Sequence, residues 1–241
     1  MRWGIFCDIH ANLEALDAVL AALAGERIDR YLCLGDIVGY GANPRECIAE
    51  IKKIDAPTIA GNHDWAAVGL FDIAYFNPAA KAAVLWTRQN LAYEDKEFLK
   101  NLDLIHREEE LTLVHASLQN PGQFEYILDI SSAARTFELL RTRLCFIGHS
   151  HAPLIFIKEG ENYSFTFQAK VKLKASRMYI INAGSVGQPR DADPRASYVV
   201  YDSESEDVEI KRVPYDVQKA QEKIIKAGLP TTLAERLAAG R

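Results

Sequence analysis

Aspartate, asparagine and histidine residues recur directly after short apolar runs, a pattern typical of a metal site. Asp8 and His10 follow the first such run. Residues two apart in extended backbone point to the same side, so these two side chains form a fork. The other candidate ligands follow later runs, and His149 and His151 among them repeat the fork: Asp36, Asn62, His115, His149 and His151.

Seven candidate ligands exceed the four that one tetrahedral zinc ion needs, and they suit two ions that share a carboxylate. The set offers nitrogen and oxygen and no thiolate, which favours Mn²⁺, Fe²⁺ or Zn²⁺ over calcium. Two such ions can bridge a hydroxide and clamp a phosphoryl group. The pattern therefore predicts two divalent metal ions and hydrolysis of a phosphate ester by in-line attack of a metal-bridging hydroxide.

His63 is the histidine left for acid–base chemistry, because it follows Asn62 but neither ion needs it. We expect it to protonate the leaving alkoxide as the general acid. Asp64 is the candidate carboxylate that would hold the tautomer of the His63 ring. His106 lies outside the pattern and is expected to be an ordinary surface or core residue.

Three residues are candidates for contacting substrate. Asn12 fits a phosphate contact and equally the N-cap of the following helix. Tyr40 lies near Asp36, where a substrate contact competes with the preferred interpretation, a simple turn. Arg190 ends the glycine-rich segment 184–190, which either brings a cation to phosphate or forms a tight turn. The apolar loop Gly69 to Phe76 is a lid, a pocket wall or, by preference, part of the core.

The first 60 residues predict the framework that positions these side chains. Strands are expected at 3–7, 31–34 and 57–60, with helices at 11–24 and from Pro44 to Ile54 between them. Fully apolar strands that alternate with helices indicate a parallel sheet. The carboxyl ends of parallel strands share one edge, so Asp8, Asp36 and Asn62 should converge there.

After residue 60 the sequence no longer predicts alternating strands and helices. Residues 65–105 are expected to be mainly helical, and the chain should end in helices near 214–227 and 231–239. No linker rich in glycine, serine or proline divides the sequence, so one domain over residues 1–241 is predicted. Short strands are expected between these helical regions, at 111–115, 143–147, 153–158, 163–168, 177–182, 197–201 and 207–212.

Composition narrows the partners and the compartment. A net charge of −5 disfavours binding of long nucleic acid. No apolar run reaches the length of a membrane span, and Asp8 comes too early for a signal peptide. The four cysteines form no Cys-x-x-Cys pair and are expected to be buried, reduced thiols. A cytoplasmic protein without a membrane partner is the expectation, and its oligomeric state is left open.

The motifs in order are Asp8-x-His10, Gly35-Asp36, Gly61-Asn62-His63-Asp64, His115 and Gly148-His149-x-His151. This series resembles the calcineurin-like metallophosphoesterases, and the segment 182–190 is similar to their small bacterial and archaeal phosphodiesterase branch. The resemblance implies an α/β fold, a four-layer α/β/β/α sandwich of two mixed sheets flanked by helices. It also implies that Asp36 bridges the two ions. The ligands implied for one ion are Asp8, His10 and His151, and for the other Asn62, His115 and His149.

The resemblance also excludes two branches of that superfamily. Protein Ser/Thr phosphatases continue the second motif as Gly-Asp-x-Val-Asp-Arg-Gly, and symmetrical dinucleoside tetraphosphatases share that motif. This chain has Tyr40 at the position of the arginine, and its third motif ends in Asp64 where the phosphatases have glutamate. A protein phosphatase is therefore not expected.

A metal-dependent phosphodiesterase that acts on a small phosphate ester is the function that these residues favour. A nuclease or a nucleotide phosphomonoesterase is the alternative within the enzyme class, and nucleotides are among the candidate substrates. The alternative from another class is a non-catalytic scaffold of the same fold, as in the retromer subunit that resembles this family. That subunit lacks the equivalent of His63, which this chain retains.

Overall fold

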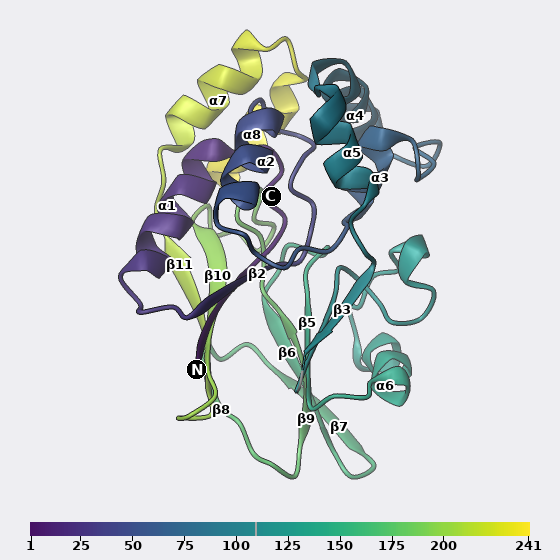
Figure 1. Ribbon diagram of the computed structural model, residues 1–241, viewed down its shortest axis with the longest axis vertical. Coiled ribbons are helices and arrows are strands. Elements are labelled where there is room, and N and C mark those ends of the chain that lie inside the picture. Colours follow the sequence, from purple (N-terminus) through teal and green to yellow (C-terminus); the bar gives the residue numbers. More distant parts are fainter. Residues whose placement is uncertain (109) are drawn as a thin grey trace.

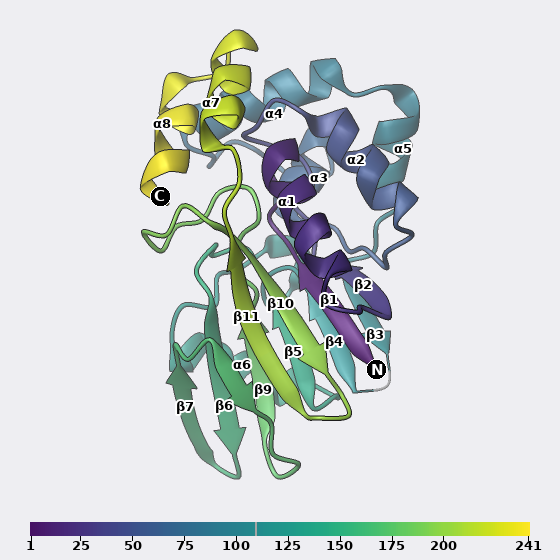
Figure 2. The same ribbon diagram turned by 90° about the vertical axis from the view of Figure 1, so that its left-hand side faces the viewer.

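The structure is a computed structural model that describes residues 1–108 and 110–241. Two mixed β-sheets lie against each other, with helices on their outer sides, which confirms the predicted fold class (Figures 1 and 2). No helix in the described part of the chain is both long enough and apolar enough to cross a membrane.

The first sheet has the strand order β2-β1-β10-β11-β8. β1 and β2 are parallel, and β10 pairs antiparallel with β1 and β11. Its strands are β1 (Arg2–Phe6), β2 (Arg30–Cys33), β8 (Lys170–Lys172), β10 (Ala196–Asp202) and β11 (Asp207–Val213).

The second sheet has the order β3-β4-β5-β9-β6-β7. β4, β5 and β9 run parallel, and the outer pairs are antiparallel. Its strands are β3 (Ile105–Glu108), β4 (Leu111–Val114), β5 (Leu144–Ile147), β6 (Leu154–Glu159), β7 (Asn162–Thr166) and β9 (Met178–Asn182).

Apolar side chains fill the space between the sheets, because the central strands are buried on both faces. Ile5 and Val199 of the first sheet belong to one core cluster with Phe146 and Tyr179 of the second. α1 covers the outer face of the first sheet, and α6 covers that of the second.

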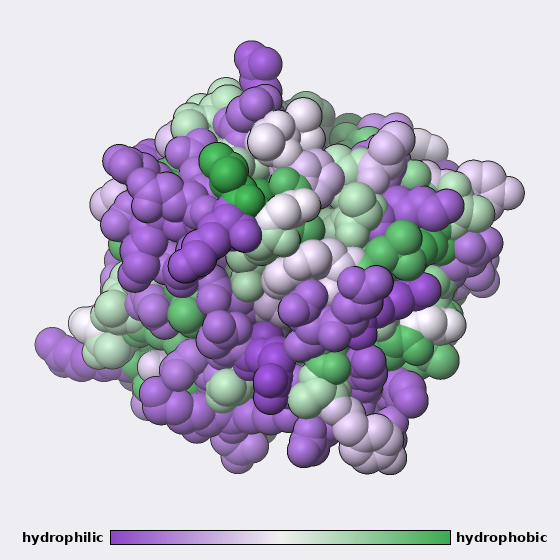
Figure 3. Space-filling view, turned by 90° about the horizontal axis from the view of Figure 1, so that it is seen from above, coloured by the Kyte–Doolittle hydropathy of each residue, from purple (hydrophilic) through white to green (hydrophobic). Residues whose placement is uncertain are grey.

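Most of the helices gather at one end of the two sheets, and α6 lies apart from them (Figures 1 and 2). Viewed onto that end, the surface mixes hydrophilic residues with small apolar areas (Figure 3). The helices are α1 (Leu13–Ala24), α2 (Pro44–Lys53), α3 (Asn62–Val68), α4 (Pro78–Asn90), α5 (Tyr93–Lys100), α6 (Ile130–Leu139), α7 (Val217–Lys226) and α8 (Thr231–Ala239), with a short 3-10 turn at Pro121–Gln123.

Three parts of the fold differ from the sequence prediction. The prediction of a strand at 57–60 is wrong, because this segment makes only isolated bridges, from Thr58 to Cys33 and from Ile59 to Asp103. β3 and β8 were not predicted, since both are short edge strands with many polar residues. α6 was not predicted either, although Asp129 caps its first turn.

Candidate metal centre and adjoining pocket

Six of the seven candidate ligands lie in loops that leave the carboxyl ends of β1, β2, β4 and β5, and the seventh, Asn62, begins α3. Left-handed backbone is rare for residues other than glycine and costs roughly 1–3 kcal/mol each, and such strain concentrates at functional sites. The loops cross-brace one another: the amide of His10 donates to the carbonyl of Asp36 over 2.9 Å. Five of the candidate ligands have left-handed backbone, with φ between 50° and 66°: Asp8, His10, Asp36, His149 and His151.

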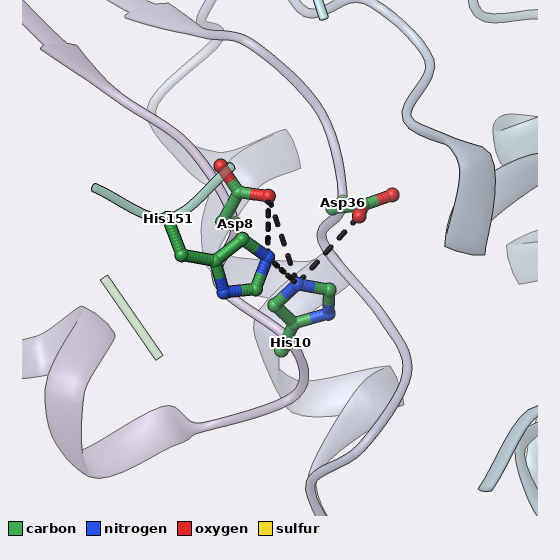
Figure 4. A group of neighbouring side chains, drawn as sticks. All are labelled: Asp8, His10, Asp36 and His151. Carbon is green, nitrogen blue, oxygen red and sulfur yellow. Dashed lines mark hydrogen bonds and ion pairs between the residues drawn. The ribbon is translucent and has the colours of Figure 1, made fainter. Parts of the chain in front are cut away.

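Two groups of buried ligand atoms form at this edge, and Asp36 belongs to both. Within each group the ligand atoms lie within 4.8 Å of one another, close enough to surround a cation. Figure 4 shows the first group, in which the side chains point toward one another. The first group is Asp8, His10, Asp36 and His151, and the second is Asp36, His115 and His149.

The histidine rings present lone pairs to the centre of the site. Nδ1 of His10 faces the carbonyl of Val38 at 3.2 Å, and Nδ1 of His151 faces that of Gln188 at 2.6 Å. A carbonyl only accepts, so each Nδ1 carries the hydrogen and each Nε2 carries a lone pair. The two Nε2 atoms lie 3.1 Å apart. Two lone pairs at that distance repel unless a cation lies between them.

The two aspartates divide their oxygens between the fold and the centre. Oδ2 of Asp8 accepts from the amide of His149 at 3.0 Å, and Oδ1 of Asp36 accepts from the amide of His63 at 2.8 Å. The second oxygen of each, Oδ1 of Asp8 and Oδ2 of Asp36, has no hydrogen-bond partner within the described residues. A buried polar atom without a partner is costly. These oxygens are therefore suited to metal coordination.

Asn62 and His115 contribute the same kind of unpartnered atom. Oδ1 of Asn62 and Nε2 of His115 are buried and lack a hydrogen-bond partner in the described part of the chain. Nδ1 of His115 lies 2.7 Å from the carbonyl of Leu34, which fixes its tautomer as in the other rings. The donor set of nitrogen and oxygen atoms fits divalent metal ions.

The charges of the site favour a positive group at its centre. Burial lowers the pKa of His115, but Asp36 and Asp8 raise it to about 9 overall. Burial raises the pKa of Asp8, yet the neighbouring histidines hold it well below its usual range. Burial keeps His149 and His151 neutral, with pKa values of about 3 and about 4. Neutral imidazole is the form that binds metal.

His63 is buried beside the first ligand group, in the first turn of α3. Its ring lies 4.9 Å from the ring of His10 and 4.4 Å from that of Tyr40, centroid to centroid. A Cβ atom at Gly39 would lie 2.5 Å from Nδ1 of His63, and Gly39 has a φ of +95°. Only glycine fits this position without moving the ring.

The expected contact between Asp64 and the His63 ring is not formed. Nδ1 of His63 has no hydrogen-bond partner among the described residues. Oδ2 of Asp64 accepts from the amide of Gly61 at 3.0 Å, and Oδ1 accepts from the amide of Val38 at 3.2 Å. Asp64 is the N3 residue of α3, so its carboxylate turns back to cap the helix and braces two ligand loops.

Tyr40 and Arg190 lie together beside the ligands and line the same pocket. Nη2 of Arg190 donates to Oη of Tyr40 at 3.2 Å and to Oε1 of Gln188 at 3.1 Å. The Tyr40 ring packs in an apolar cluster with Leu233 and Leu237 of α8, which supports the pair from behind.

Asn12 caps α1, which is one of its two predicted roles. Its Oδ1 accepts from the amide of Ala15 at 3.2 Å, and its Nδ2 donates to the carbonyl of Gly187 at 2.9 Å. Both polar groups of the amide are thus engaged within the fold. The phosphate contact stays a prediction.

A pocket of about 280 Å³ opens over the ligands. Its walls include aromatic residues from two loops, of which the sequence analysis considered only the first, Gly69 to Phe76, as a pocket wall and did not assign the second, with Phe124 and Tyr126, to the site. The Gly69 to Phe76 loop was favoured as core, but it lines this pocket, and Tyr75 within it is 96% exposed. The aromatic residues of the two loops are Phe71, Tyr75, Phe76, Phe124 and Tyr126.

Three proteins are similar to this chain over nearly their whole lengths. A protein of Methanocaldococcus jannaschii is 40% identical over 243 residues, which cover 98% of this chain and 97% of that protein. The crystal structure of a metallophosphoesterase from Sphaerobacter thermophilus is 40% identical with a TM-score of 0.88, and the match covers 100% of this chain and 99% of that one. The crystal structure of a hypothetical protein from Pyrococcus horikoshii shows the same fold at 21% identity, with a TM-score of 0.82 and 100% and 98% coverage.

The family model for the calcineurin-like phosphoesterase superfamily domain matches residues 1–206, a range that contains every candidate ligand. The chain therefore belongs to the calcineurin-like phosphoesterase superfamily.

Proposed function

We propose that this protein is a dinuclear metal-dependent phosphodiesterase that hydrolyses a small phosphate ester. The observation that carries the proposal is that Asp36 belongs to both groups of ligand atoms. A carboxylate shared between two groups is the arrangement that two adjacent ions require.

The ligands divide between the two ions as the family resemblance implies. Asp8, His10 and His151 would hold one ion, and Asn62, His115 and His149 the other. When bound, Mn²⁺, Fe²⁺ or Zn²⁺ ions would polarise the phosphoryl group and lower the pKa of bound water, which supplies the nucleophile. The chain's own residues bind the ester, hold it in place and move the proton.

His63 is the proposed general acid for the leaving alcohol. Its ring lines the pocket but belongs to neither ligand group, so it is free to face the ester. Asp64 acts as a positioning residue, because it joins the loops that carry Gly61 and Val38 on either side of His63.

We assign the binding of the substrate phosphate to Arg190 and Tyr40, with Asn12 as a further candidate. Arg190 is the one arginine or lysine that lines the pocket within the described residues. One cation suits the single negative charge of a phosphodiester better than the double charge of a monoester, which favours the diester.

The proposal is tested by hydrolysis of bis-p-nitrophenyl phosphate, with added Mn²⁺, Fe²⁺ or Zn²⁺ and with a chelator. We expect turnover that requires metal, and elemental analysis that finds two ions per chain. Hydrolysis of nucleoside monophosphates but not of diesters would favour a phosphomonoesterase. Metal binding without turnover of any ester would favour a non-catalytic scaffold.

Two further assignments accompany this function. We propose that residues 1–241 act as one domain, because α7 and α8 pack on Tyr40 at the pocket. We also propose a cytoplasmic location, because the four cysteines are buried free thiols, which are typical of reducing compartments.

A further inference from the structure

The pocket over the ligands is built mainly from aromatic side chains. Six of its sixteen lining residues are phenylalanine or tyrosine, whereas these types and tryptophan make up 10% of the sequence. Five of the six come from the two loops at 69–77 and 123–126. An enrichment of this size marks a surface that accepts an apolar or planar group.

The aromatic wall is continuous with the reaction centre. The ring of Tyr126 stacks on that of His149, with 4.0 Å between centroids and 22° between planes. On the other side, the ring of Phe76 lies 5.0 Å from that of His63. Phe71 links the two loops, with centroids 6.1 Å from Phe76 and 5.2 Å from Phe124. The leaving group of the ester, which His63 would protonate, therefore lies among these aromatic side chains.

Two rings at the rim are open to a ligand. Tyr75 is 96% exposed and Tyr126 is 48% exposed. Large aromatic groups that project into water from a pocket rim are available for stacking on a planar partner.

The same walls carry polar groups that can bind the edge of a heterocycle. Asp72, Asn77 and Gln123 line the pocket, and all three are exposed. They supply a carboxylate acceptor and amide donors and acceptors. Oδ1 of Asp72 accepts from the amide of Ala74 and Oδ1 of Asn77 from that of Ala80, both at 2.9 Å. Oδ2 of Asp72, Nδ2 of Asn77 and the exposed amide of Gln123 therefore remain to bind a ligand in place of water.

The charge and the volume of the pocket limit the length of the substrate. Among the described residues, only Arg190 adds a lysine or arginine charge to the pocket lining, and Asp36 and Asp72 add negative charge. A strand of nucleic acid needs a row of cations along its backbone. The volume of about 280 Å³ is at the small end of ligand pockets.

We propose that the leaving group of the natural diester is a nucleoside, so that the substrate is a short nucleotide diester. This inference rests on the proposed phosphodiesterase function and names its substrate class. In the reaction, the oxygen of a water molecule bonds to phosphorus and the bond from phosphorus to the nucleoside oxygen breaks. That nucleoside oxygen takes a proton from His63 and leaves as an alcohol, and the proton that the water loses replaces the one that His63 donates.

The test compares kcat/KM for two diesters, thymidylyl-thymidine and glycerophosphoethanolamine, in the metal-loaded protein. We expect the dinucleotide to be favoured at least about 5-fold, the lower bound for stacking one base. Tyr75→Ala should lower this preference, and Tyr75→Phe should retain it because the ring remains. As a readout without turnover, thymidine monophosphate should inhibit more strongly than glycerol phosphate.

Tyr93→Ala is the matched control, because Tyr93 is 75% exposed at the start of α5 and does not line the pocket. It should leave the preference unchanged. Equal or absent turnover of the two diesters would overturn the inference, and so would a preference for a lysophospholipid. If bis-p-nitrophenyl phosphate is still hydrolysed in those cases, the phosphodiesterase function stands. If it is not, that function fails as well.

Discussion

Nε2 of His10 and Nε2 of His151 face each other at 3.1 Å, and the Nδ1 atom of each ring faces a backbone carbonyl. Neither ring can turn away without losing its bond to the carbonyl. The loops thus hold two lone pairs together, in residues whose backbone is itself strained. The folded state is therefore destabilised at these two histidines, and a bound cation offsets this unfavourable free energy.

The first prediction is that metal ions stabilise the fold. At a free concentration 100 times the dissociation constant, an ion that binds only the native state adds about 2.7 kcal/mol. We expect the Tm to rise with Mn²⁺ or Zn²⁺ and to fall with a chelator, measured by calorimetry. His10→Ala should reduce the rise, while His106→Ala, outside the site, should preserve it. An identical Tm with metal and with chelator would contradict the metal assignment.

His63→Ala should retain the metal but lose about 10²-fold or more in diesterase rate, the usual contribution of a general acid. The loss should be larger for an alkyl leaving group than for p-nitrophenol, because p-nitrophenol departs without much help from an acid. Rates on both esters and elemental analysis of the variant provide the measurement. Full activity of this variant on the alkyl ester would remove His63 from the mechanism.

Gly39→Ala should lower kcat while the metal content stays constant. The added Cβ would lie 2.5 Å from Nδ1 of His63, so the ring must shift. Gly160→Ala is the control, since Gly160 also has positive φ but has open space around it. Equal kinetics in the two variants would show that the position of the His63 ring is unimportant.

Arg190→Ala should raise KM for a diester by roughly 10-fold, because it removes the charge-assisted contact proposed for phosphate. Tyr40→Phe removes only the hydroxyl that accepts from Arg190 at 3.2 Å and should have a smaller effect in the same direction. Arg190→Lys should restore KM only in part, since lysine lacks the planar fork. Steady-state kinetics at saturating metal measures all three, and an unchanged KM in Arg190→Ala would refute this role.

Alkaline pH should destabilise the protein through its buried thiols. Burial raises the pKa of Cys145 to about 12, whereas a thiol in an unfolded chain ionises near 8.5. The native state therefore keeps a proton that the unfolded state releases, and stability falls as the pH rises from about 9 toward 12. In urea unfolding over this window, Cys145→Ala should flatten the slope by up to about 1.4 kcal/mol per pH unit. The same slope in both proteins would show that Cys145 titrates normally.

The sequence was most informative where a strand end carries a polar residue. Asp8 and Asp36 were placed together from topology alone, since parallel strands such as β1 and β2 share a carboxyl edge. The helices α1 and α2 were predicted for a related reason, because the spacing of their apolar residues is a local signal.

Features that depend on distant contacts were not predicted. Tyr126 stacks on His149 across the pocket, and no local pattern connects those two positions. The partners of Asp64 were also missed: pairing with the adjacent His63 was expected, but capping of α3 takes its oxygens. β8 escaped prediction because a three-residue strand of the sequence Lys-Val-Lys gives almost no periodicity.

The support that α8 gives to Tyr40 has a consequence for biosynthesis. The carbonyl of Gly240 accepts from the amide of Ala192 at 3.0 Å, so the last helix also fastens the segment that follows Arg190. A nascent chain that has emerged only as far as residue 230 already contains every candidate ligand but lacks the backing of the Tyr40–Arg190 pair. Under the proposed function, synthesis of the metal ligands is thus complete before that of the helix that supports the proposed phosphate contact.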